Sequence, residues 1–129
     1  MTMRDPPAAG RVRAERRGRS AETLAAAFLR AKGYRILARR FRVPVGEVDL
    51  VAKRGRTLAF VEVKARRTGD AGLEAISPQG RARIARAAEA YLARYPAAAA
   101  LTLRFDVIVV APWRLPRHLV GAFGAGGAL

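Results

Sequence analysis

The sequence predicts an α/β protein in which a mixed β-sheet is flanked by helices, in the order helix, strand, strand, strand, helix, strand. Apolar residues recur at the spacing of an amphipathic helix over 21–29 and again over 84–95. Short β-rich stretches lie between them, and the continuous apolar run at 107–110 is typical of a strand covered on both faces. A single sheet with helices packed on it accommodates this order of elements.

Residues 1–19 are rich in arginine, proline, alanine and glycine, which predicts a disordered basic arm. The first helix is expected to begin after Ser20, a good N-cap residue, and to end at Gly33. Residues 34–43 then alternate as expected of a strand, until Pro44 breaks the pattern.

The next two strands are expected at 47–53 and 57–65 and form a hairpin signature. If Gly55 and Arg56 are the central residues of a type II′ turn, Arg54 pairs with Thr57. Continuing that register places Asp49 opposite Glu62 and Glu47 opposite Lys64. The hairpin therefore brings several charged side chains together.

The second helix is expected to start at Ser77 and Pro78, because serine caps helices well and proline suits the first helical position. Pro96 ends it, and a fourth strand follows at 101–111. The expected domain spans 20–123, and the glycine- and alanine-rich residues 124–129 are expected to form a flexible tail.

The composition excludes several kinds of site. The chain has 129 residues, no cysteine and one histidine, which excludes disulfides, thiolate nucleophiles, cysteine-ligated metals and multi-histidine metal sites. No stretch approaches the roughly 20 apolar residues of a membrane span, and the arginine-rich start lacks the apolar centre of a secretory signal. We therefore expect one cytoplasmic domain without a membrane partner.

The formal net charge of +15 favours a polyanionic partner such as nucleic acid. The alternative is a compositional bias, because 22 of the 25 basic residues are arginine and 28 residues are alanine, as a GC-rich genome would produce. Charge alone leaves both interpretations open.

The candidate chemistry lies among the few acidic residues. Glu22, Glu47, Asp49 and Glu62 are four of the ten acids in the chain. Opposed carboxylates destabilise a sheet, and a divalent cation such as Mg²⁺, which prefers oxygen ligands, would relieve their repulsion. The alternative is that Glu47 pairs with Lys64 and that arginines satisfy Asp49. Lys64 is one of three lysines, and lysine, unlike arginine, can place or deprotonate water beside a metal.

The motifs resemble a known nuclease constellation. Glu22 in the first helix, Gly46-Glu47-Val48-Asp49-Leu50 and Phe60-Val61-Glu62-Val63-Lys64 look like the PD-(D/E)XK pattern. More narrowly, they resemble the bacterial YraN-like family of uncharacterised predicted endonucleases, which is similar to archaeal Holliday-junction resolvases. The match extends through Phe28-Leu29, Gly33-Tyr34, Ala87 to Leu92, Arg104-Phe105-Asp106-Val107, Arg117-His118-Leu119 and Ala122-Phe123.

The resemblance implies a restriction-endonuclease-like fold and a Mg²⁺- or Mn²⁺-dependent endonuclease acting on DNA, including branched or junction DNA. It implies that Asp49 and Glu62 bind the metal, that Lys64 supports the attacking water, and that Glu22 contributes to the metal site directly or through water. It also raises a homodimer as the assembly to test, as in junction-cutting relatives. A non-catalytic nucleic-acid-binding module, acting in repair or ribonucleoprotein assembly, is the alternative function.

Seven arginines are candidates for gripping phosphates, because they flank the acidic motifs or lie on the second helix: Arg39, Arg40, Arg42, Arg66, Arg67, Arg81 and Arg83. Two further polar residues receive structural interpretations. His118 is expected to pack or cap, and Asp106 is expected to pair with Arg104.

Overall fold

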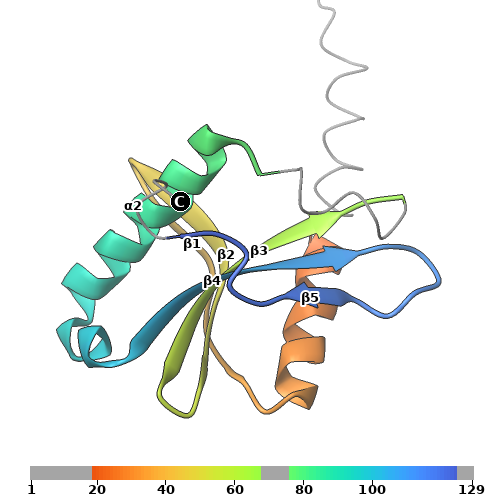
Figure 1. The fold of residues 1–129 in the computed structure, drawn as a ribbon, viewed down its shortest axis with the longest axis horizontal. Helices are drawn as coiled ribbons and strands as arrows, with labels where there is room; N and C mark the ends of the chain where they lie inside the picture. The colour runs from red at the N-terminus through yellow and green to blue at the C-terminus, as the bar shows by residue number, and fades with distance from the viewer. Residues whose placement is uncertain (1–18, 68–75, 125–129) are drawn as a thin grey trace, which may run out of the picture.

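The computed structural model describes residues 19–67 and 76–124. One mixed five-stranded sheet has the order β1-β2-β3-β4-β5, in which β3 and β4 are parallel and every other neighbouring pair is antiparallel (Figure 1). The elements are helix α1 (19–31), β1 (Arg35–Val43), β2 (Gly46–Arg54), β3 (Thr57–Ala65), helix α2 (Pro78–Arg94), the 3₁₀ helix η2 (Pro96–Ala100), β4 (Thr102–Val110) and β5 (Arg117–Leu119). The predicted α/β class and mixed sheet are confirmed.

The two helices cover opposite faces of the sheet. Ala59 and Val61 of β3 belong to the cluster that contains Leu29 of α1, whereas Leu58 and Phe60 belong to the cluster around α2. Because successive strand residues point to opposite faces, this alternation assigns one helix to each face. The apolar runs 58–61 of β3 and 107–109 of β4 are therefore buried on both faces of the sheet.

Helix α1 differs from the prediction at its start. Arg19 and Ser20 are already helical, so the prediction that Ser20 caps the helix is wrong. The basic arm expected over 1–19 otherwise lies outside the described residues. The predicted end is confirmed: Gly33 has φ +94, and the N–H groups of Gly33 and Tyr34 donate to the carbonyls of Arg30 and Leu29. This is the bonding pattern of a Schellman motif.

The β2–β3 hairpin has the predicted register. Arg54 pairs with Thr57, and the ladder continues to Leu50 and Val61. Gly55 has φ +59, as the first central position of a type II′ turn requires.

Helix α2 also begins as predicted, with the side chain of Ser77 accepting a 3.0 Å hydrogen bond from the N–H of Gly80. The sequence did not predict β5, which pairs with β4 through Val107–Leu119 and Val109–Arg117. Of the flexible tail expected over 124–129, only residue 124 is among the described residues. Within the described parts of the chain, no helix combines the length and hydropathy that crossing a membrane requires.

Candidate active site

The predicted acidic residues come from three neighbouring elements. Glu22 is on α1, Asp49 is on β2, and Glu62 and Lys64 are on β3. Burial, the charge and hydrogen bonding of Glu62, and the charge of Glu22 raise the pKa of Asp49 to about 8. The N–H of Val63 opposes this rise but does not outweigh it. Asp49 is therefore close enough to both Glu62 and Glu22 to interact with them electrostatically.

Asp49 is held by the backbone of the neighbouring strand. Its Oδ2 accepts a 2.8 Å hydrogen bond from the N–H of Val63. Among the described strands, the β2–β3 ladder ends at Leu50 and Val61, so the expected backbone pair of Asp49 with Glu62 is not formed. A side-chain oxygen takes the place of a backbone acceptor at the point where regular pairing stops.

Lys64 forms an ion pair with Glu62, not with Glu47, the residue that the extended hairpin register places opposite it. Its Nζ lies 3.1 Å from Oε2 of Glu62, and both side chains are about one-fifth exposed. Oε1 of Glu47 instead lies 3.7 Å from Nε of Arg42 and 3.3 Å from Nη2 of Arg83. The alternative interpretation, in which Glu47 pairs with Lys64, is therefore wrong for the described residues. Lys64 pairs with Glu62 inside the candidate site.

Glu22 is nearly buried, at 8 % exposure, and is engaged by an arginine. Nε of Arg40 donates a 2.7 Å hydrogen bond to Oε1 of Glu22. Arg40 has φ +54, in the left-handed region that residues with a Cβ rarely adopt. Strain of this kind persists where the surroundings over-determine a conformation, and it is common at functional sites.

The donor set suits one hard divalent cation bound by a carboxylate pair. Asp49 and Glu62 present oxygen donors, and their mutual repulsion contributes to the raised pKa of Asp49. Across residues 19–67 and 76–124, no group of three or more acidic, histidine or cysteine side chains has the spacing of a metal centre. Glu22, which the resemblance implies as a further contributor, is paired with Arg40.

The seven candidate phosphate-binding arginines are divided over several surfaces. Arg42 and Arg83 meet at Glu47, which joins β1 to α2. The guanidinium of Arg39 donates to Oγ1 of Thr23, and Arg40 pairs with Glu22. Arg66 and Arg67 line a groove with Lys64, whereas Arg81 lies in a small hollow beside Phe123.

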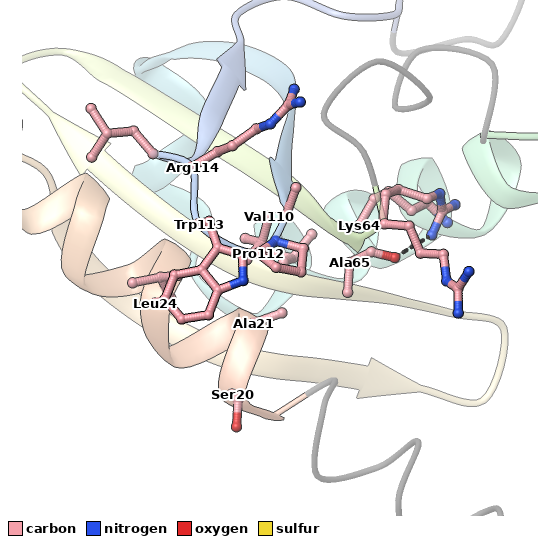
Figure 2. A pocket seen from close by; sticks show the side chains of 14 residues that line it. Ser20, Ala21, Leu24, Lys64, Ala65, Val110, Pro112, Trp113 and Arg114 are labelled. Carbon is pink, nitrogen blue, oxygen red and sulfur yellow. Dashed lines mark hydrogen bonds between the residues drawn. The ribbon is translucent and has the colours of Figure 1, made fainter.

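That groove also contains residues that no sequence motif marked as functional. Figure 2 shows Trp113, Leu24 and Pro112 on one side of it and Lys64 and Ala65 on the other. A tryptophan beside a proline in a basic segment was the available signal, but sequence alone does not distinguish an exposed indole from a core residue.

A second polar cluster lies outside the acidic site. Asp106 is fully buried and accepts hydrogen bonds from Arg104, from Nε2 of His118 and from the N–H of Gly121. The predicted pairing of Asp106 with Arg104 and the packed position of His118 are confirmed. Since β5 carries His118, this cluster attaches the last strand to β4.

Known proteins match this chain along nearly its whole length. A protein of Rhodopseudomonas palustris (strain BisA53), named only as a UPF0102 protein, is 56% identical over 120 residues, covering 93% of this chain and 92% of its own. A UPF0102 protein of Methylorubrum extorquens (strain PA1) is 57% identical over 127 residues, covering 97% and 99%. Residues 21–110 match the model of a family described as "Uncharacterised protein family UPF0102". The chain therefore belongs to UPF0102, the YraN-like family that its acidic motifs indicate.

Proposed function

We propose that this protein is a divalent-cation-dependent endonuclease of the PD-(D/E)XK type that hydrolyses phosphodiester bonds in DNA, including branched or junction DNA. The observation that carries the proposal is the grouping of Asp49, Glu62 and Lys64, in which Lys64 Nζ lies 3.1 Å from a Glu62 oxygen and Asp49 interacts with Glu62. Two carboxylates and one lysine on adjacent strands suit hydrolysis of a phosphodiester.

Asp49 and Glu62 would hold a Mg²⁺ or Mn²⁺ ion, which when bound polarises the phosphoryl oxygen and offsets charge at the leaving oxygen. The N–H of Val63 fixes the Asp49 carboxylate, which leaves its other oxygen to face Glu62 or a cation. Lys64 has three donors on a flexible stem, so it can hold the attacking water while remaining close to Glu62.

The surrounding charge supports a nucleic-acid substrate. Arg66 and Arg67 follow Lys64 after one intervening residue, Ala65, and line the same groove. Cations beside the reacting groups attract a phosphate backbone through release of its counterions, so binding should weaken steeply with salt.

Cleavage with matched lysine variants tests the proposal. Linear DNA and four-way-junction DNA would be incubated with the full chain and Mg²⁺ or Mn²⁺. We expect Lys64→Ala to slow cleavage by at least about 100-fold, because it removes a group that acts on the reacting atoms, while DNA affinity changes little. Lys53→Ala removes a lysine from β2 outside the site and should cleave as the unchanged protein does.

The second candidate is a non-catalytic nucleic-acid-binding module. The Glu22–Arg40 ion pair favours it, because that pair occupies an acidic group that a three-carboxylate metal centre would use. DNA binding without cleavage of any substrate in Mg²⁺ or Mn²⁺, together with no Mn²⁺ at Asp49 and Glu62 in a soaked crystal, would establish this alternative.

A further inference from the structure

A groove of about 1180 Å³ runs beside the candidate active site. It lies between residues 20–24 of α1, the end of β3 with the residues that follow, and the end of β4 with the loop 111–115 (Figure 2). Lys64 belongs to both the groove and the acidic site. A ligand in the groove would therefore contact Lys64 of the candidate active site.

The groove presents apolar side chains to solvent. Trp113 is 100 % exposed and Leu115 is 84 % exposed, and Leu24 of α1 is 44 % exposed. Three exposed large apolar residues around one concavity indicate a binding surface rather than scattered surface residues. Trp113 also has φ +62, so its indole is displayed from a left-handed backbone conformation that residues with a Cβ rarely adopt.

The charged residues that line the groove are all basic. Lys64, Arg66, Arg67 and Arg114 contribute to its walls, and no acidic residue in the described parts of the chain does so. A matching ligand combines repeated negative charge with flat apolar surface. A single strand of nucleic acid has both features, because its phosphates are anionic and its unpaired bases can stack on aromatic side chains.

We propose that this groove binds a single-stranded segment of nucleic acid, with an unpaired base stacked on Trp113 and the adjoining phosphates held by Arg66, Arg67 and Arg114. The proposal extends the proposed nuclease function by naming the substrate as nucleic acid that has an unpaired strand beside the cleavage site. A base inside an intact duplex has both faces stacked, so the indole distinguishes an open strand from a closed one.

Tryptophan fluorescence tests this directly, because Trp113 is the only tryptophan in the chain. The full-length protein would be titrated, in a metal chelator, with a thymidine 15-mer and with a blunt duplex of the same length. We expect the single strand to quench the emission of Trp113 and the duplex to change it little.

Affinity measured by anisotropy of a labelled 15-mer supplies the second readout. We expect Trp113→Ala to weaken single-strand binding by about 5- to 150-fold, the range for loss of one aromatic stacking platform, and Trp113→Phe to retain most of the affinity. Since Trp113 is fully exposed, its removal should not affect folding. Tyr95→Ala, which removes a 48 % exposed aromatic ring outside the groove, is the matched control and should leave affinity unchanged.

The outcomes separate this proposal from the proposed nuclease activity. Three outcomes would overturn the groove proposal, whether or not the protein cleaves DNA. They are an unchanged single-strand affinity in Trp113→Ala, equal quenching of Trp113 by the duplex, and equal quenching by polyglutamate, a polyanion without bases. Quenching that persists in Lys64→Ala supports the groove proposal even if no variant cleaves DNA, in which case the nuclease proposal alone fails.

Discussion

The backbone N–H of Val63 and Oδ2 of Asp49 form a 2.8 Å hydrogen bond that links β3 to β2 just beyond their last regular pair. This bond holds a carboxyl group whose ionisation is opposed by burial and by Glu62. The hydrogen bond from Val63 therefore stabilises the position of the Asp49 carboxyl group, whereas burial and the repulsion between Asp49 and Glu62 disfavour its ionisation. A bound cation would relieve that repulsion.

Asp49→Asn should stabilise the cation-free protein at pH 8. Because the pKa of Asp49 in the folded protein is about 8, above its ordinary value of 3.8, ionisation is disfavoured by the fold, and the free energy of unfolding falls as pH rises from about 4 to about 8. Asparagine keeps an acceptor for Val63 and can donate to Glu62. We expect a gain of at least about 1 kcal/mol at pH 8 and a smaller gain at pH 5, measured by thermal unfolding in a chelator.

Asp49→Ala is the control, because it removes the charge and also leaves the Val63 N–H without its acceptor. It should be less stable than Asp49→Asn at both pH values. A loss of stability in Asp49→Asn at pH 8 would contradict the electrostatic interpretation.

Gly46→Ala should destabilise the protein because β2 touches α2 at this residue. A Cβ there would overlap the carbonyl oxygen of Arg83 and lie 3.0 Å from the backbone nitrogen of Ala87, so backbone would have to move. We expect a cost of about 2 kcal/mol or more in urea unfolding. Gly80→Ala is the matched control, because its Cβ would meet only side-chain atoms at 3.4 Å or more. It should be neutral or stabilising by up to about 1 kcal/mol, and equal effects at both glycines would refute the packing argument.

Local sequence signals predicted most of the fold. Ser77 with Pro78, Gly33, and the Gly55 turn each act through backbone geometry within a few residues, and the structure confirms all three. The strand β5 was not predicted, because three residues carry too little pattern. It is held by long-range contacts, namely its backbone pairing with β4 and the hydrogen bond between His118 and Asp106.

The candidate site was predictable only as a set of residues. The hairpin register follows from the turn, but the bond from Val63 to Asp49 forms where that register ends. The left-handed backbone of Arg40 left no signal in the sequence, since arginine is not a residue that favours it. Contacts between distant elements, such as that of Arg40 with Glu22, require the folded chain.

Arg40→Gly should be more stable than Arg40→Ala. Both variants lose the ion pair with Glu22, but only alanine keeps a Cβ in the left-handed conformation at φ +54. We expect a difference of about 1 kcal/mol in favour of glycine in urea unfolding. Arg39, the neighbouring strand residue, does not have positive φ, so there the order should reverse, with Arg39→Ala more stable than Arg39→Gly. Arg40→Ala being as stable as Arg40→Gly, or more stable, would show that Arg40 is not strained.

Asp106→Asn should destabilise the protein more than any of the preceding variants. Asp106 is fully buried and accepts bonds of 2.8–2.9 Å from Arg104, His118 and the N–H of Gly121. Asparagine has one acceptor oxygen where Asp106 has two, and it leaves the Arg104 charge without its partner. We expect a loss of about 3–5 kcal/mol at pH 7, with thermal unfolding as the measurement.

The pH dependence identifies charge, rather than shape, as the source of that loss. Burial alone would raise the pKa of Asp106, but the hydrogen bonds from His118, Arg104 and Gly121 outweigh it and lower the pKa to about 2. A lowered carboxyl pKa adds stability that is fully present above about 4 and is lost as pH falls from about 4 to about 2. The difference between Asp106→Asn and the unchanged protein should therefore narrow over that interval. Glu89→Gln, which removes an exposed acid on α2, is the control, and its stability difference from the unchanged protein should not narrow comparably over that interval. If the stability difference between Asp106→Asn and the unchanged protein were constant from pH 7 to pH 2, packing rather than charge would be its main cause.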